Sequence, residues 1–165
     1  MASRLRLFSA AALLLVAVLT ASADDAHDAL QAFGLPKGLL PDSVSSFSLA
    51  ENGKFVVELR APCYVKFTDL VHYGKTIRGQ IRYGIISDLS GIQIKKSFVW
   101  LSISDIVARP ADGTIEFIVG FLSELRPATL FESVPHCRVN ASPRGVFSPE
   151  ELLPLPVSEH HKQIY

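Results

Sequence analysis

The sequence lacks the motifs that mark the common enzyme and nucleic-acid-binding classes. It has no G-x-S-x-G serine elbow, no H-E-x-x-H zinc motif and no glycine-rich phosphate loop. In the 165-residue chain, 16 Lys and Arg residues balance 16 Asp and Glu residues, so no basic surplus is available for a nucleic-acid backbone. We therefore expect no catalytic residues, no metal or other cofactor, and no nucleic-acid partner.

Long apolar runs are confined to the N-terminus. Two arginines precede an apolar run over residues 7–19, and the small residues of an A-x-A site follow. This arrangement is typical of a secretory signal peptide, and the run is shorter than the roughly 20 residues that span a bilayer. We therefore expect a signal peptide over residues 1–23, cleaved between Ala23 and Asp24, instead of a membrane anchor. The mature protein would be secreted to the extracellular space and would have no membrane span.

Cysteine is scarce, because the chain contains only Cys63 and Cys137. In an oxidising compartment an even number of cysteines favours a disulfide, and this one would contribute about 4 kcal/mol by closing a long loop. Two buried free thiols are the alternative. Asn140 begins an Asn-Ala-Ser sequon, so it is the predicted N-glycosylation site, although Pro143 directly after the sequon lowers its expected occupancy.

The mature sequence begins with a helical pattern and continues with strand patterns. Apolar residues recur at helical spacing up to Phe33, after which Gly34 and Pro36 end the pattern. From Ser45 onward apolar and polar residues alternate, as in strands with one buried face. The clearest strand is 76–85. Its predicted core-facing residues are Ile77, Gly79, Ile81, Tyr83 and Ile85.

Glycine-containing clusters divide the strand-rich region. Asn52-Gly53 predicts a hairpin with a type I′ turn, Gly74-Lys75 predicts a second hairpin, and Leu89-Ser90-Gly91 predicts a further turn. Short, evenly spaced strands predict a mainly β fold, an antiparallel pseudo-barrel or sandwich with one short N-terminal helix packed on it. We expect a single β-rich domain over residues 24–138 and a Pro-rich, flexible C-terminal tail over residues 139–165.

One predicted strand, from Phe98 to Val107, is apolar on both faces along half its length. Packing by the helix or by an opposing sheet would cover Phe98 and Trp100, and so would a ligand or a partner. The ligand interpretation gives an apolar face made of Phe98, Trp100 and Phe117, between the sheet and the helix. Such a site requires a cavity of several hundred Å³.

Two groups of polar residues have more than one interpretation. His72 and the nearby Asp69 could act together as a general base, or they could form a site that coordinates a porphyrin metal. The ordinary alternative is that both are polar residues beside a turn. Arg78 and Arg82 form a short basic stripe that could bind an acidic head group or a cell-wall polysaccharide. Solvated outward residues are the ordinary alternative for such a stripe.

Several short motifs follow one another between about residues 30 and 138. They are Gly34-Leu35-Pro36 with Gly38-Leu39-Leu40-Pro41, Ile77-x-Gly79 with Gly84, Leu89-Ser90-Gly91-Ile92, Trp100-Leu101-x-Ile103 with Ile106, Phe117-x-Val119-Gly120, and Pro135-x-Cys137. In this order they resemble the plant domain-of-unknown-function 538 family. The resemblance implies a mostly antiparallel β pseudo-barrel with a helix packed on it, in small plant proteins of which many carry signal peptides. It also implies a likeness of fold to lipid-binding domains of the bactericidal/permeability-increasing type, and a chlorophyll-hydrolysing activity that has been proposed for some members.

These observations predict a secreted plant protein that binds a hydrophobic small molecule or a lipid. An esterase or chlorophyll-hydrolase-type enzyme is one alternative, and a cell-wall or protein interaction module is the other. No residue pattern assigns an oligomeric state.

Overall fold

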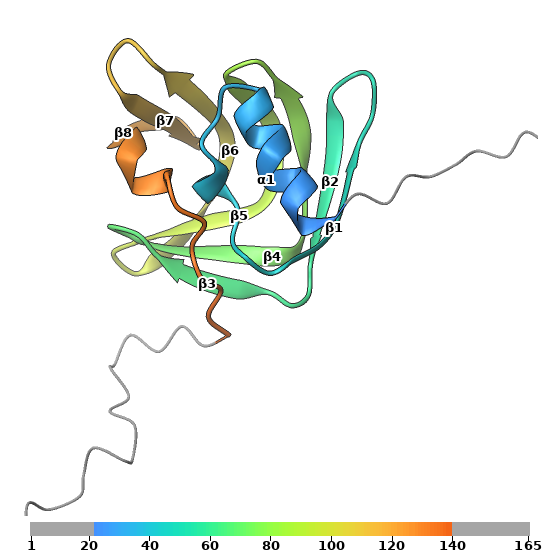
Figure 1. Cartoon of the computed structure of the whole chain (residues 1–165). Coiled ribbons are helices and arrows are strands. Elements are labelled where there is room, and N and C mark those ends of the chain that lie inside the picture. The colour runs from blue at the N-terminus through green and yellow to red at the C-terminus, as the bar shows by residue number, and fades with distance from the viewer. Residues whose placement is uncertain (1–21, 140–165) are drawn as a thin grey trace, which may run out of the picture.

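The computed structural model of the chain describes residues 22–139 (Figure 1). The predicted signal-peptide run, the sequon at Asn140 and the C-terminal tail beyond Val139 lie outside these residues. The elements are α1 (Ala23–Ala32), η1 (Lys37–Leu39), β1 (Val44–Leu49), β2 (Lys54–Leu59), β3 (Cys63–Lys66), β4 (Leu70–Arg82), β5 (Ile85–Lys96), β6 (Val99–Arg109), β7 (Thr114–Val119), β8 (Leu122–Pro127) and η2 (Ala128–Phe131), where η marks a 3₁₀ helix.

The short N-terminal helix is confirmed as α1. Two acidic residues in its first turn suit the positive end of the helix dipole, and Ala26 and Leu30 are buried against the core. Gly34 follows the helix with φ +73°, a conformation that glycine adopts without a steric penalty. The N–H of Leu35 donates to the carbonyl of Leu30 at 2.9 Å, which closes the C-terminus of the helix.

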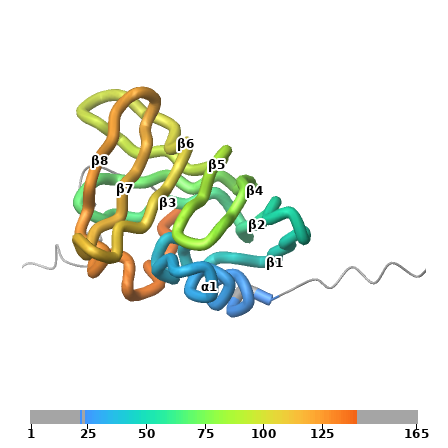
Figure 2. The backbone as a smooth tube through the Cα atoms, turned by 90° about the horizontal axis from the view of Figure 1, so that it is seen from above, coloured from blue at the N-terminus to red at the C-terminus, as the bar shows by residue number. Residues whose placement is uncertain are grey.

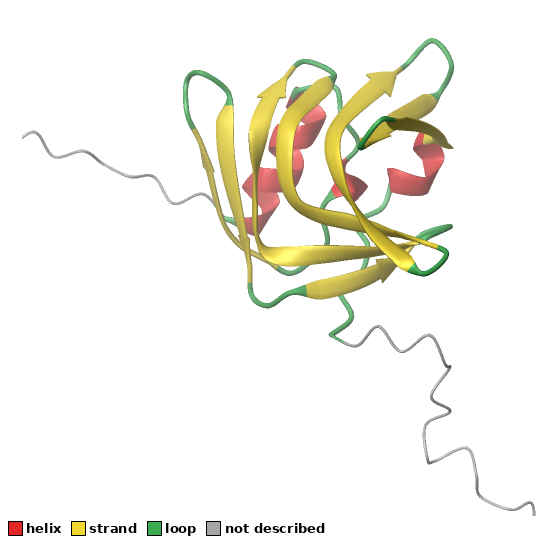
Figure 3. Cartoon of the chain, turned by 180° about the vertical axis from the view of Figure 1, so that it is seen from behind, coloured by secondary structure: helices red, strands yellow, loops and turns green. Residues whose placement is uncertain are grey.

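The strands form one antiparallel sheet, which confirms the predicted fold class. Their order is β1-β2-β4-β5-β6-β7-β8, and β3 pairs with β4 beyond the end of β2. Figure 3 shows that the sheet is strongly curved and that the helical segments all lie on one face of it.

The helical segments close the curved sheet into a pseudo-barrel. α1 contacts β1 and η1, η1 contacts η2, and η2 contacts β7, so this helical layer links the first strand of the sheet order to its far end. The hydroxyl of Tyr73 on β4 donates to the carbonyl of Leu39 at 3.0 Å, which ties the layer to the middle of the sheet. The enclosed core is apolar and includes Leu35, Val57, Leu59, Ile77, Ile92, Ile106 and Phe131.

The predicted hairpin at Gly74-Lys75 and the predicted turn at Leu89-Ser90-Gly91 are wrong, because both segments lie inside the long paired strands β4 and β5. Tyr73 pairs with Ile92 and Arg78 with Ser90, so β4 carries extra residues at a bulge. Gly91 has φ +94°, and a Cβ there would clash with the carbonyl oxygen of Thr76. Gly91 therefore lies at a bulge, where the backbones of β4 and β5 approach too closely for a side chain.

Two turns differ in detail from their predictions. The β1–β2 hairpin is confirmed at Asn52-Gly53, but only Gly53 has a positive φ, +85°, so the turn is not of type I′, which requires a positive φ at both central residues. Tyr83 was predicted to face the core and is 79% exposed. The reason is that β4 ends at Arg82, so Tyr83 lies in the turn before β5.

Candidate functional site

The space between the sheet and the helical layer contains two small apolar cavities. One of about 40 Å³ includes Phe117 and Phe131 in its lining, and one of about 30 Å³ lies nearer α1; both are also lined by Leu39, Ile92 and Ile106. A water molecule needs about 10–15 Å³, so each cavity holds only a few atoms. Neither cavity has the several hundred Å³ that a drug-sized ligand requires.

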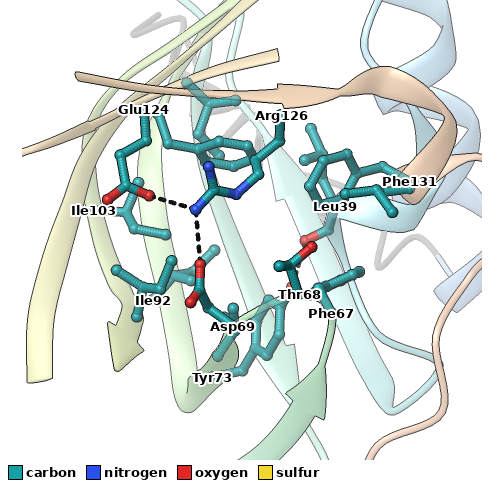
Figure 4. Close-up of a pocket in the computed structure, with 15 residues that line it drawn as sticks. Leu39, Phe67, Thr68, Asp69, Tyr73, Ile92, Ile103, Glu124, Arg126 and Phe131 are labelled. Carbon is teal, nitrogen blue, oxygen red and sulfur yellow. Dashed lines mark hydrogen bonds and ion pairs between the residues drawn. The ribbon is translucent and has the colours of Figure 1, made fainter. Parts of the chain in front are cut away.

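Four charged side chains form a rim at the edge of the larger cavity: Asp69, Lys96, Glu124 and Arg126. Figure 4 shows the Arg126 guanidinium between the carboxylates of Glu124 and Asp69, at 2.9 and 2.8 Å. The Lys96 ammonium lies 2.7 Å from each of the same two carboxylates. Each acid therefore pairs with both bases, and the rim is electrically balanced.

The rim alters the protonation equilibria of two of its members. Burial opposes ionisation of Asp69, but hydrogen bonds from Lys96 and Arg126 outweigh it and hold the pKa of Asp69 below its ordinary value. Burial also opposes the charge on Lys96, but hydrogen bonds to Asp69 and Glu124 outweigh it and raise the pKa of Lys96. Both shifts favour the charged forms of Asp69 and Lys96.

We expect Asp69→Asn to lower the free energy of unfolding at pH 7 by about 1–2 kcal/mol, because it removes one partner of two charge-assisted hydrogen bonds. A carboxyl pKa that folding depresses contributes stability above its unfolded value, and this contribution is lost as the pH falls through the folded value. The difference between variant and wild type should therefore shrink below about pH 4. Urea denaturation at pH 7 and pH 3 measures it.

The matched control is Asp112→Asn, since Asp112 is an exposed aspartate in the β6–β7 turn. It should leave stability unchanged at both pH values. A destabilisation by Asp69→Asn that is equally large at pH 3 would contradict the role of the ion pairs.

The predicted ligand face is corrected, because Phe98, Trp100 and Phe117 do not come together. Phe117 faces inward, 9% exposed, and its ring packs 5.3 Å from that of Phe131. Phe98 lies in the turn between β5 and β6 and is 97% exposed. Trp100 is on the outer face of β6, where its ring centroid is 6.0 Å from those of Tyr64 and His72. Only Phe117 lines the interior.

The structure also separates His72 from Asp69. The His72 ring lies on the outer face, 4.8 Å from the Tyr64 ring, whereas Asp69 is held in the rim. The basic stripe faces outward, with Arg78 and Arg82 exposed. Within residues 22–139 no group of three or more His, Cys, Asp or Glu side chains is arranged to hold a metal ion.

The predicted disulfide between Cys63 and Cys137 is confirmed, with Cα atoms 5.5 Å apart. Ala23 and Asp24, which flank the predicted signal cleavage, are the first two residues of α1. In the described part of the chain no helix is long and apolar enough to cross a membrane.

Among the exposed apolar residues of the described part of the chain, two pairs lie at hairpin turns, a placement that sequence reasoning missed; others, such as Leu125 and Val139, lie elsewhere. We define the hairpin tips as Phe98 on the β5–β6 turn with Val99, the first residue of β6, and Phe121 on the β7–β8 turn with Leu122, the first residue of β8. Their exposed fractions are 97%, 56%, 98% and 49%, in that order. Each turn has two central residues, and the second of them is a phenylalanine. The first is Ser97 (φ +53°) in the β5–β6 turn and Gly120 (φ +64°) in the β7–β8 turn. The Gly120-Phe121 pair between alternating runs was the available sequence signal.

The two hairpin tips lie on the same side of the molecule. Val119, the last residue of β7, pairs with Ile103, the fifth residue of β6, so the β7–β8 turn lies about four residues along β6 from the β5–β6 turn. Figure 2 shows both turns projecting on the same side, away from α1. The rim is close to them, since Lys96 directly precedes the β5–β6 turn and Glu124 follows the β7–β8 turn. We call this part of the molecule the tip end.

The sequence matches a protein family model. A family model described as "Protein of unknown function, DUF538" matches residues 26–132, which is more than half of the chain and extends from α1 to η2. No curated protein matches the chain.

Proposed function

We propose that this chain, which belongs to the DUF538 family of proteins of unknown function, binds lipid surfaces through its hairpin tips. The observation that carries the proposal is the near-complete exposure of Phe98 and Phe121 on one side of the molecule. Transferring a phenylalanine side chain out of water gains about 1.5–3 kcal/mol. Exposed apolar groups gathered at one place mark an interaction surface.

A lipid surface suits the shape and chemistry of the tips. Both phenylalanines project from two-residue turns whose flanking residues pair with each other, Lys96 with Val99 and Val119 with Leu122. The strand hydrogen bonds continue up to these turns, so little unpaired backbone enters an apolar layer. Lys96 and Arg126, just behind the tips, would remain at the level of the polar head groups.

The small size of the interior cavities supports a lipid contact at the surface over a ligand held inside the barrel. Neither interior cavity exceeds about 40 Å³, whereas the apolar area of the tips is already exposed. The disulfide between Cys63 and Cys137 supports the proposal that the chain is secreted, because disulfides persist in oxidising compartments. The lipid surface would then be an extracellular one.

The two alternatives have less support from the described residues. For an esterase, His72 and Asp69 would have to act together, and they lie in different environments. For a cell-wall or protein interaction module, the same tips would bind a protein partner or a wall polymer, and this outcome would show as tip-dependent binding without any affinity for lipid.

The test is sedimentation with vesicles of phosphatidylcholine mixed with phosphatidylserine. We expect Phe98→Ser and Phe121→Ser each to weaken vesicle binding about tenfold, and the double variant about a hundredfold, because each removes one phenylalanine from the apolar layer. Tyr83→Ser is the matched control, since Tyr83 is a 79% exposed aromatic residue in the turn at the other end of β5. It should bind like the wild type.

Thermal unfolding checks that all variants fold. A wild-type protein that sediments with no vesicle, or a folded double variant that binds as tightly as the wild type, would overturn the proposal.

A further inference from the structure

We infer that the outer face of the tip end carries a binding site for the head groups of anionic phospholipids, built around Lys66 and Lys95. This inference rests on the proposed function, because it names the class of lipid that the hairpin tips meet. It is carried by a row of outward side chains across four strands, by the aromatic residues behind that row, and by a local surplus of positive charge.

The strand register places four side chains in one row. Lys66 on β3 pairs with Leu70 on β4, and Lys95 on β5 pairs with Trp100 on β6. Val71 pairs with Ile94, so the preceding residue of β4, Leu70, lies beside Lys95 in the antiparallel register. We call Lys66, Leu70, Lys95 and Trp100 the tip row.

The tip row faces outward at the level of the turns. Val65, Val71 and Ile94, strand neighbours of Lys66, Leu70 and Lys95, are buried, and successive residues of a strand point to opposite faces. The row lies immediately before the turns that follow β3 and β5. When the hairpin tips enter the apolar layer, this row therefore reaches the zone of the head groups.

A second row behind the first is partly aromatic. Tyr64 pairs with His72, His72 with Gln93, and Gln93 with Ser102. The Trp100 ring lies 6.0 Å from the Tyr64 ring, and the Lys95 ammonium lies 5.9 Å from the centroid of the Trp100 ring. Tryptophan and tyrosine combine an apolar ring with a polar group, so they are favoured at the boundary between head groups and acyl chains.

The charges of the two rows are uncompensated. Lys66 is exposed and makes no ion pair among residues 22–139, and the Lys95 ammonium lies over the Trp100 ring. Neither row contains an acidic residue. Lys96 and Arg126, in contrast, are neutralised by the two carboxylates of the rim. The surplus positive charge of the tip end therefore belongs to Lys66 and Lys95.

The spacing of the two lysines suits a surface that carries many phosphates. They are two strands apart, which at about 4.8 Å per strand separates their backbones by about 10 Å. Two flexible ammonium groups at this separation can each meet a different phosphate group. In an electrically neutral lipid such as phosphatidylcholine each phosphate is balanced by its own choline, whereas an anionic lipid surface has a net negative charge that the two lysines can balance.

The experiment compares vesicles of phosphatidylcholine alone with vesicles that also contain phosphatidylserine. We expect the wild type to prefer the mixed vesicles and the preference to fall as salt is added. The variant Lys66→Gln/Lys95→Gln should lose about fivefold in affinity per lysine for the mixed vesicles. Its affinity for phosphatidylcholine alone, which depends on the hairpin tips, should be unchanged.

The matched control is Lys54→Gln/Lys75→Gln, which removes two exposed lysines outside the tip end and should retain the preference. Equal wild-type affinity for both vesicle types, or a preference that survives Lys66→Gln/Lys95→Gln, would overturn the inference while the proposed function stands. An absence of binding to either vesicle type would overturn both. A soluble acidic polysaccharide, added at the same total negative charge as the mixed vesicles, is a competitor. If it abolishes the preference, the two lysines bind another anionic polymer and the inference is also overturned.

Discussion

Replacing both cysteines by alanine is expected to lower the free energy of unfolding by about 4 kcal/mol. This loss of stability is larger than the one expected for any other variant. The Cys63–Cys137 bridge closes a loop with a sequence separation of 74, and cross-linking so long a loop restricts the unfolded chain strongly. Urea denaturation of the oxidised wild type and of Cys63→Ala/Cys137→Ala measures the difference.

The bridge also fixes the last described segment against β3 and the loop before β1. The backbones of Tyr64 and Arg138 exchange two hydrogen bonds, of 2.7 and 3.0 Å. The N–H of Cys137 donates to the Asp42 carboxylate at 2.9 Å. We expect these contacts to become transient once the covalent link is absent, because the segment makes few other contacts with the sheet.

The reduced wild type is the control for the cysteine prediction. Cys63 is fully buried, so its replacement removes packing as well as the cross-link, whereas reduction removes the cross-link alone. The reduced protein should therefore show most of the loss. If it unfolds at the same urea concentration as the oxidised protein, the bridge does not supply the stability assigned to it.

The strands were predictable because alternation is a local property. On β7, Ile115, Phe117 and Val119 are buried and the residues between them are not, as the alternation predicts for a strand with one buried face. The end of α1 was equally local, since Gly34 and Pro36 stop a helix whatever surrounds them. The fold class followed from these two periodicities without any knowledge of which strands pair.

The glycines of β4 and β5 could not be assigned to a turn or to a bulge from the neighbouring sequence alone. A glycine with positive φ serves a turn or a bulge equally well, and the choice depends on whether the chain on either side continues to pair. Gly91 pairs within β5 because β4 supplies partners on both sides of it. That pairing is a long-range property, so the sequence around Gly91 alone predicted the wrong feature.

The candidate site was missed for a related reason. Alternation puts Phe98 and Trp100 on one face only if both belong to the strand, and Phe98 instead lies in a turn entered through Ser97 at φ +53°. A serine rarely adopts this conformation, so nothing in the sequence marked the turn. The ion pairs of the rim could not be predicted from the sequence either, because Asp69 and Arg126 are 57 residues apart in the chain.

Replacing Gly38 by alanine is expected to lower the free energy of unfolding by about 3 kcal/mol, the upper range for overpacking a core. Gly38 lies in η1 and is buried. A Cβ at this position would clash with the backbone carbonyl oxygens of Phe131 and Ser133. Backbone cannot rotate away as a side chain can, so η2 and the residues after it would have to move.

The clash lies where η1 meets η2, the contact through which the helical layer closes the sheet. A displacement there would also strain the hydrogen bond from Tyr73 to Leu39 at 3.0 Å. Gly74→Ala is the matched control, because Gly74 does not have a positive φ and a Cβ there meets nothing closer than 3.4 Å. Urea denaturation should find Gly74→Ala within about 1 kcal/mol of the wild type. A Gly38→Ala variant as stable as Gly74→Ala would mean that η2 yields easily, and that the sheet does not depend on this contact to remain closed.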